Sequence, residues 1–411
     1  MADNPGSPSP WSQSGGSTPP GSPPLPGATP PAAQPGATPP GSPPPESHPS
    51  AFAPRPVAPP VIAPPVVSPP PIGGNSISAQ AIAATSSPRP SAAQVARIKA
   101  LYDRITGEVA KIYVGQEELV LGALVALFSS GHVLIESVPG LGKTLFVRVL
   151  GRVLGCQCGR IQFTADLMPS DITGAPIFDM KQQEFRFRPG PVFTQFLLAD
   201  EINRSPAKTH AALLEIMQEY HVTVERTTHK LKRPFLVLAT QNPLESEGTY
   251  NLPEAQLDRF MFKIIADYPS VAEEILILKQ HGQQKDLDTQ LAKTLQTVTS
   301  PEEIVEITTL ASGVHIEDQL FAYINQLVRA TRQWPHFHLG ASPRAGIALV
   351  QGSRTMAAFR GRDYVVPDDV VDIVLPALRH RVVLTAEAEV EGQTTDEQLR
   401  ELVRSIEVPR L

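Results

Sequence analysis

The stretch Val133-Leu-Ile-Glu-Ser-Val-Pro-Gly-Leu-Gly-Lys-Thr144 decides the fold of this chain. It predicts a buried strand, a glycine-rich turn and the start of a helix, in that order. In such a turn, backbone N–H groups point inward at phosphate oxygens, and the helix N-terminus adds positive potential. Gly140 and Gly142 permit backbone conformations that other residues avoid. The stretch therefore predicts a phosphate-binding loop.

Two side chains of this loop have expected chemical tasks. We expect Lys143 to reach the β- and γ-phosphates of a nucleotide and Thr144 to ligate magnesium through its hydroxyl. The expected nucleotide ligands of the loop are Ser137, Val138, Pro139, Gly140, Leu141, Gly142, Lys143 and Thr144. Ser137 departs from the usual pattern, which opens with glycine. A plain strand-to-helix turn is the alternative, but the Gly-Leu-Gly-Lys-Thr run between a strand and a helix favours the phosphate loop.

Two further apolar strands end in polar residues. One ends at Asp200 and Glu201, and the other ends at Asn242. Ligands of open parallel sheets collect at the C-terminal ends of the strands. We expect Asp200 to hold the magnesium shell, Glu201 to polarise the attacking water, and Asn242 to orient that water or contact the γ-phosphate. The alternatives are a solvated turn for the acidic pair and a turn-initiating asparagine before proline.

Two arginines are candidates for contacts with the γ-phosphate. We expect Arg259 to act as a finger on the nucleotide of a neighbouring subunit, a role worth roughly 10³–10⁵ in rate. Its alternative is a salt bridge with Asp258 or another local carboxylate. Arg344 follows Pro343, which fits the first position of a helix. We expect Arg344 to reach back to the γ-phosphate and to couple lid closure to ATP; a solvated surface arginine is the alternative.

The order of elements predicts an α/β fold. The predicted elements are strands at 132–136, 196–200 and 235–240 and helices at 91–112, with Ser91 as N-cap, 117–130, 143–154 and 207–220. Continuous apolar strands between helices imply a parallel sheet covered on both faces. After about residue 269 the strand pattern stops and helical periodicity continues. We therefore predict an α/β domain at 91–269 and a helical domain at 270–411.

Residues 1–90 differ from the rest of the chain in composition. They hold roughly two thirds of the 44 prolines and few charged residues. Proline favours polyproline II, and too few large apolar groups remain to offset chain entropy. We predict a disordered proline-rich tail that serves as a spacer. A docking strip for a proline-binding partner is the alternative.

Bulk properties exclude several classes of protein. The net charge is −6 and the pI is about 6.0, so nothing draws the whole chain to nucleic acid or anionic membranes. The longest apolar run, 119–128, is shorter than the roughly 18 residues that a membrane span needs. The N-terminus lacks the pattern of a signal peptide. Two cysteines, Cys156 and Cys158, favour a reducing compartment and inert packing, so we expect a cytoplasmic location.

Taken together, seven stretches resemble the MoxR family of AAA+ ATPases over roughly residues 110–411. They are VGQEE (114–118), VPGLGKT (138–144), RIQFTADLMPSDITG (160–174), FRPGPVF (187–193), LADEINRSPAKTHAALLEIMQE (198–219), LATQNPLESEGTYNLPEAQLDRF (238–260) and GASPRA (340–345). Such long, ordered matches are more specific than the phosphate loop alone. The proline-rich tail is not covered.

The resemblance implies a AAA+ core with a helical lid, ATP and Mg²⁺ as ligands, and rings that are expected to be hexamers. It also implies the following roles: Lys143 and Thr144 in Walker A, Asp200 and Glu201 in Walker B, Asn242 as sensor 1, Arg259 as the arginine finger, Arg344 as sensor 2, and Val114 and Gly115 as backbone next to adenine. Family members are thought to remodel or activate proteins, often with von Willebrand factor A domain partners. Ser137 departs from the family's usual glycine.

The stretch 177–187 predicts a β-hairpin with its tip at 181–183, and it resembles an insertion typical of this AAA+ clade, which can face the ring pore. By strand alternation Phe185 and Phe187 share one face. They are expected either to grip a partner or to make core contacts. A second small hairpin is predicted at 221–231.

Three functions remain open from the sequence. The first is an ATP-driven protein remodeller. The second is a nucleotide-gated scaffold whose rings assemble on ATP but barely turn it over. The third is a nucleic-acid motor, against which the acidic balance argues.

Overall fold

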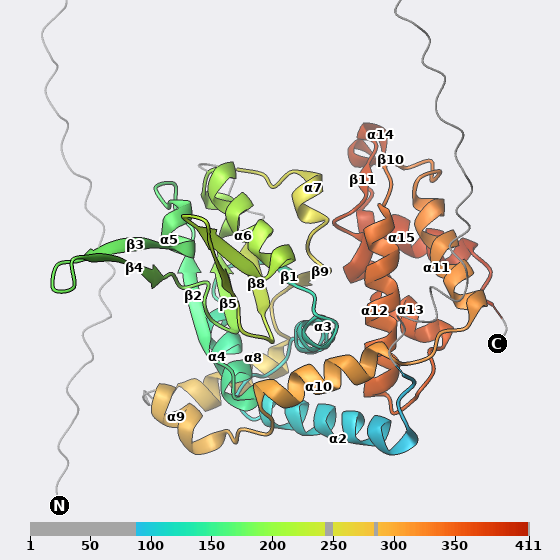
Figure 1. Ribbon diagram of the computed structural model, residues 1–411. Coiled ribbons are helices and arrows are strands. Elements are labelled where there is room, and N and C mark those ends of the chain that lie inside the picture. Colours follow the sequence, from blue (N-terminus) through green and yellow to red (C-terminus); the bar gives the residue numbers. More distant parts are fainter. Residues whose placement is uncertain (1–87, 243–249, 283–286, 410–411) are drawn as a thin grey trace, which may run out of the picture. The chain divides into compact units, whose positions relative to one another are not determined.

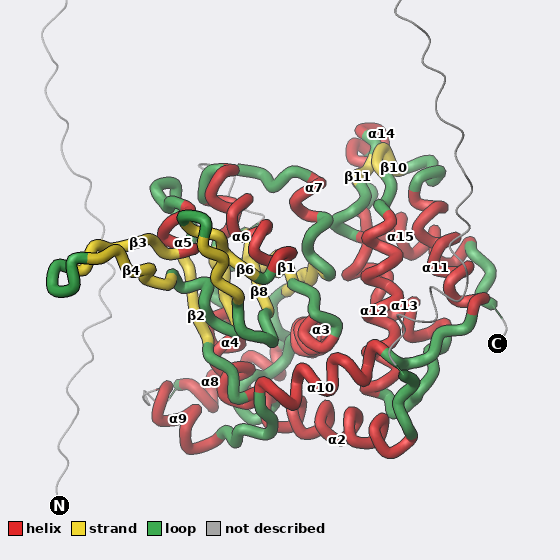
Figure 2. The backbone as a smooth tube through the Cα atoms, in the orientation of Figure 1, coloured by secondary structure: helices red, strands yellow, loops and turns green. Residues whose placement is uncertain are grey.

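A computed structural model describes residues 88–242, 250–282 and 287–409. Its central element is a parallel five-stranded sheet with the strand order β2-β5-β8-β1-β9 (Figure 1). The strands are β1 (Val133–Ser137), β2 (Cys158–Gln162), β5 (Phe196–Asp200), β8 (Leu236–Gln241) and β9 (Phe262–Ala266). Figure 2 shows these strands as one group with helices on both sides. The predicted fold class, a parallel sheet sandwiched by helices, is confirmed.

Seven helices lie before and between the strands in the part of the chain that the structure describes. They are α2 (Ala92–Val109), α3 (Glu117–Phe128), α4 (Lys143–Leu154), α5 (Pro169–Thr173), the short 3₁₀ helix η1 (Ile202–Arg204), α6 (Ala207–Glu219) and α7 (Glu254–Leu257). Of these, α2, α3, α4 and α6 correspond to the four predicted ones, whereas α5, η1 and α7 were not predicted. Ser91 caps α2 as predicted, because its Oγ accepts a hydrogen bond from the backbone N–H of Gln94 at 3.3 Å.

The C-terminal part of the chain is mainly helical. It contains α8 (Val271–His281), α9 (Leu287–Thr294), α10 (Pro301–Ser312), α11 (Asp318–Thr331), α12 (Pro343–Phe359), α13 (Pro367–Leu378), α14 (Ala386–Val390) and α15 (Thr395–Ser405). Two short strands, β10 (Phe337–Leu339) and β11 (Val383–Leu384), pair here, so the expectation that strands stop after residue 269 is wrong. These strands are too short to produce a period in the sequence.

The sheet contains two strands that the sequence pattern did not predict, β2 and β9. Only one residue of β2, Ile161, is fully buried, because this strand lies at the edge of the sheet. β9 forms the opposite edge and carries Lys263 among its apolar residues. Exposed polar residues interrupt β2, and Lys263 interrupts β9, so neither strand has the continuous apolar run that marks a central strand.

Two hydrophobic clusters lie on the two faces of the sheet. Side chains of a strand alternate between faces, so Leu197 and Ala199 of β5 belong to one cluster, while Phe196 and Leu198 belong to the other. The smaller cluster includes residues of α5 and α6. The larger cluster joins α2, α3 and α4 to the C-terminal helices.

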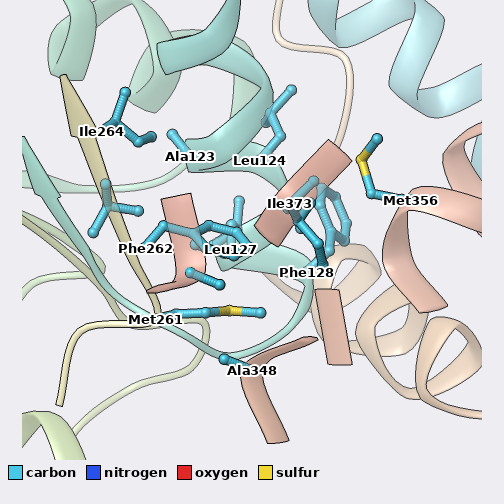
Figure 3. Packing of buried hydrophobic residues seen from close by; sticks show 14 of the residues in the cluster. Ala123, Leu124, Leu127, Phe128, Met261, Phe262, Ile264, Ala348, Met356 and Ile373 are labelled. Atoms are coloured by element: carbon cyan, nitrogen blue, oxygen red, sulfur yellow. The ribbon is translucent and has the colours of Figure 1, made fainter. Parts of the chain in front are cut away.

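The larger cluster joins α3 and β9 to the C-terminal helices. Figure 3 shows Leu127 and Phe128 of α3 together with Phe262 of β9 and Ile373 of α13. The core is therefore continuous across residue 269. The division into domains at 91–269 and 270–411 stays a prediction.

Both predicted hairpins are present. β3 (Gly174–Asp179) pairs with β4 (Glu184–Pro189), and β6 (His221–Val224) pairs with β7 (Thr227–Lys230). Phe187 stacks on His229 of the second hairpin with ring centroids 4.0 Å apart. Phe185 is 69% exposed and touches Phe178 across the first hairpin. The two phenylalanines therefore differ: Phe187 makes an internal contact and Phe185 faces outward.

Two expectations fall wholly or partly outside the described residues. The structure does not describe residues 1–87 of the proline-rich tail that is predicted at 1–90. It also does not describe residues 243–249, which belong to the stretch 238–260 that resembles the MoxR family. Within the described ranges, no helix combines the length and the apolar character that crossing a membrane requires.

Candidate functional site: a nucleotide-binding edge and an arginine cavity

The phosphate loop and the polar strand ends meet at one edge of the sheet. β8 lies between β5 and β1, and all three strands run parallel. Their C-terminal ends therefore lie side by side. The phosphate loop follows β1, Asp200 and Glu201 lie at the end of β5, and Asn242 follows β8 between them. Asn242 is buried there.

The phosphate loop has the backbone that anion binding requires. Gly140 and Gly142 adopt left-handed conformations, with φ of +90° and +73°. Helix α4 begins directly afterwards at Lys143, has no side-chain cap and has no acidic residue in its first turn. The N–H groups of that turn are therefore not taken by a side-chain acceptor of their own helix. This arrangement fits phosphate oxygens.

Ser137, the departure from the usual glycine, is the last residue of β1. It lies opposite Ala266 of β9 in the parallel register, and it is not among the residues with positive φ. A serine therefore fits the backbone here without strain. Its Oγ is buried without a hydrogen-bond partner among the described residues. A buried hydroxyl with unused hydrogen-bonding capacity at the start of the loop is compatible with a polar ligand there.

Asp200 is held in place by two neighbouring side chains. Its Oδ1 accepts a hydrogen bond from Oγ1 of Thr240 at 2.6 Å, and its Oδ2 pairs with the guanidinium of Arg160 at 2.7 Å. The residue is 8% exposed. Mg²⁺ prefers one or two carboxylates together with hydroxyl, water and phosphate oxygens. Asp200 and Thr144 supply donors of this kind, so they fit the predicted magnesium site.

Glu201 is half-buried at the same edge and has an uncommon backbone conformation. Its φ is +56°, a region that non-glycine residues seldom occupy and that often marks functional sites. Its backbone N–H donates to Oγ1 of Thr240 at 2.9 Å. Its Oε2 accepts from Nε2 of Gln162 at 2.6 Å and pairs with Nε of Arg204 at 3.1 Å.

None of the four partners of Asp200 and Glu201 had a role in the predictions from sequence; they are Arg160, Gln162, Arg204 and Thr240. Arg160 and Gln162 lie on β2, the strand that the pattern missed. Thr240 is the penultimate residue of β8, in the polar C-terminal tip and two positions before the predicted site residue Asn242. That polar tip was the available signal for Thr240.

A cavity of about 440 Å³ lies beside the phosphate loop. Val114, Leu141 and Leu278 line it together with Tyr268, so its walls are largely apolar. Gly115, which follows Val114, has a φ of +74°. An apolar cavity that continues from a phosphate loop suits a flat base, and the contact of Val114 and Gly115 with adenine stays a prediction.

The two predicted arginines lie in a second cavity, of about 320 Å³. Arg259 and Arg344 both line it, and none of the phosphate-loop residues is among the described residues around it. Arg259 donates from Nη1 to the carbonyl of Leu214 at 3.0 Å. Its sequence neighbour Asp258 pairs instead with Arg381 at 2.7 Å.

Arg344 is exposed at the N-terminus of α12, where Pro343 is the first helical residue as predicted. It lines the cavity of Arg259 rather than the cavity beside the phosphate loop. The structure therefore brings the two arginines together and places them apart from the base cavity of their own chain.

Comparisons with known proteins agree with this geometry. Residues 132–262 match the family model described as "ATPase family associated with various cellular activities (AAA)", and residues 329–402 match the AAA lid domain. The uncharacterized protein YeaC of Bacillus subtilis is 43% identical, over 75% of this chain and 95% of its own length. Chaperone MoxR1 of Mycobacterium tuberculosis is 41% identical, over 80% of this chain and 88% of its own length.

A solved structure shows the same arrangement of elements. The crystal structure of a protein from Cytophaga hutchinsonii, assigned as an ATPase, matches with a TM-score of 0.72 and 39% identity. The match covers 77% of this chain and 98% of that one. These matches, at 41% identity over most of both chains for Chaperone MoxR1, show that the chain belongs to the MoxR family of AAA+ ATPases.

Proposed function

We propose that this chain hydrolyses ATP in a ring of its own copies, with six subunits as the family resemblance implies, and uses the reaction to remodel partner proteins. One observation carries the proposal. The phosphate loop and the acidic pair lie at one edge of the sheet, whereas Arg259 and Arg344 line a separate cavity of the same chain. A site that needs both sets of residues is complete only where two copies meet.

The residues of the first set bind nucleotide and activate water. Lys143 and the N–H groups at the start of α4 hold the phosphates, while Thr144 and Asp200 hold Mg²⁺. Bound Mg²⁺ neutralises charge that develops on the phosphate oxygens. Glu201 orients a water for in-line attack and takes up its proton, and Asn242, between the loop and Glu201, orients the same water.

The residues of the second set stabilise charge. A guanidinium carries a permanent positive charge and five N–H donors, which suits the developing charge on phosphate oxygens. Arg259 and Arg344 from one copy therefore act on the nucleotide of the next. This arrangement couples turnover to assembly, because an isolated chain lacks the second set at its own phosphates.

Phosphate release by purified protein, with Mg²⁺ and ATP, tests the proposal. We expect Lys143→Ala to abolish nucleotide binding, because the loop then loses its cation. We expect Glu201→Gln to keep binding and to lose turnover, because the amide accepts no proton. Tight ATP binding by the Lys143 variant would refute the assignment of the loop.

The same assay separates the alternatives. Negligible turnover by the wild-type protein, together with assembly on ATP in light scattering, supports a nucleotide-gated scaffold. Salt-sensitive stimulation of turnover by DNA supports a nucleic-acid motor. Affinity capture with the Glu201→Gln variant then identifies client proteins, with von Willebrand factor A domain proteins as the expected class.

A further inference from the structure

The segment that carries Arg259 is held by one buried arginine of the C-terminal region. Residues 258–261 connect α7 to β9, and Arg381 lies just after α13. Nε of Arg381 donates to Oδ1 of Asp258 at 2.7 Å. Its Nη2 donates to the carbonyls of Asp258 at 3.2 Å and Phe260 at 2.7 Å, and its Nη1 donates to Met261 at 3.1 Å and to Ala377.

These bonds use all five N–H donors of the Arg381 guanidinium. Four of them go to residues 258–261, and only the bond to Ala377 stays within the C-terminal region. Arg381 is 7% exposed, so water does not compete for these bonds. Burial lowers the pKa of Arg381, and its hydrogen bond to Asp258 opposes that shift. Arg381 therefore fixes the backbone on both sides of Arg259.

Asp258 also binds the helix that carries Arg344. Oγ of Ser342 donates to Oδ2 of Asp258 at 2.9 Å and to its Oδ1 at 3.1 Å. Ser342 is the N-cap of α12, and its Oγ accepts from the backbone N–H of Arg344 at 3.1 Å. One carboxylate thus connects the segment of Arg259 to the first turn of the helix that bears Arg344.

Three arginines and one carboxylate are among the described residues that line this cavity, and the carboxylate pairs with only one of these arginines. The carboxylate of Asp258 neutralises Arg381, whose donors are all occupied. Arg259 and Arg344 line the same cavity, where Asp258 is the one acidic residue among the described lining residues. Arg381 therefore has no N–H group left to donate to a phosphate while these bonds are intact. It affects the binding of an anion only by positioning Arg259 and Arg344.

We propose that Asp258, Arg381 and Ser342 are positioning residues that set Arg259 and Arg344 as one unit on the nucleotide of a neighbouring copy. The inference rests on the proposed function, in which these two arginines act between copies. A displacement of about 1 Å at a reacting centre costs about a hundredfold in rate. The cluster thus fixes the two arginines relative to each other.

The main test is Arg381→Lys, which keeps the charge beside Asp258 but has three donors on one atom and loses the planar fork. The matched control is Arg379→Lys, two residues away. Arg379 pairs with Asp396 at 2.8 Å with 9% of its side chain exposed, and neither residue bonds to the segment 258–261. We expect about a hundredfold loss of turnover for Arg381→Lys with unchanged ATP affinity, and less than a twofold change for the control.

A mixing experiment distinguishes positioning between copies from a general structural role. An Arg381→Lys subunit keeps its own Glu201, and a Glu201→Gln subunit keeps its own arginine cluster. In a 1:1 mixture roughly a quarter of the sites combine the two intact halves, so turnover is expected to recover well above that of either variant alone. Absence of recovery in assembled mixed rings would overturn the inference.

Ser342→Ala provides a second variant if Arg381→Lys shows a disrupted fold by circular dichroism. It removes the bond between Asp258 and α12 and is expected to lower turnover about tenfold, with the same recovery on mixing. Wild-type turnover by either variant, while Arg259→Ala is inactive, overturns the inference and leaves the proposed function standing. An inactive wild-type protein refutes the proposed function itself.

Discussion

Lowering the pH from 7 to 5 should destabilise this protein through the buried His132. The residue lies just before β1 and is 3% exposed. Its Nδ1 accepts a hydrogen bond from the backbone N–H of Val237 at 3.1 Å, so the proton of the neutral ring is on Nε2, which donates to the carbonyl of Met217 at 3.0 Å. Protonation of Nδ1 would place its N–H directly opposite the backbone N–H of Val237, so this hydrogen bond would be lost. Burial is the main cause that lowers the pKa of His132, to about 4.

The sign of the effect follows from this shift. In the unfolded chain a histidine has a pKa of about 6.5, so between pH 6.5 and pH 4 the unfolded state binds more protons than the folded state. The free energy of unfolding therefore falls as the pH falls through this window. From pH 7 to pH 5 the loss is about 2 kcal/mol, and it approaches about 3 kcal/mol below pH 4.

Urea unfolding followed by circular dichroism at pH 7 and pH 5 measures this effect. His132→Gln serves as the comparison, because it removes the titrating ring and keeps an amide donor. Other buried histidines with a lowered pKa, such as His380, contribute equally to both proteins. The variant should be less stable at pH 7 but should lose about 2 kcal/mol less between the two pH values. Equal losses in the two proteins would refute the neutral, buried state of His132.

Two further predictions concern turnover. Arg259→Ala should leave ATP binding intact and lower turnover in assembled rings by roughly 10³-fold or more. Mixing this variant with Glu201→Gln subunits should restore part of the activity. Normal turnover by Arg259→Ala would place the arginine finger at another residue. Gln162→Ala should lower phosphate release about tenfold to a hundredfold at unchanged ATP affinity, because Glu201 then loses the hydrogen bond of 2.6 Å from Gln162. Full activity of this variant would show that Arg204 alone orients Glu201.

The sequence by itself determined the elements whose pattern is local. The phosphate loop, the apolar strand ending at Asp200, and the helix opened by Pro343 are each specified by consecutive residues, and the structure contains the corresponding elements at these positions. A buried central strand or a glycine-rich turn requires particular residue types at a few consecutive positions, so it can be recognised without knowledge of the fold. The edge strands β2 and β9 have no such local pattern, because exposed residues interrupt β2 and the charged Lys263 interrupts the apolar residues of β9.

Tertiary structure alone decided which side chains meet. Arg160 and Asp200 are 40 residues apart in the chain, and Asp258 and Arg381 are 123 apart. Such pairs depend on strand order and on the packing of helices against the sheet, neither of which a local period encodes. For the same reason, only the fold shows that Arg344 lies beside Arg259 in a cavity away from the phosphate loop of its own chain.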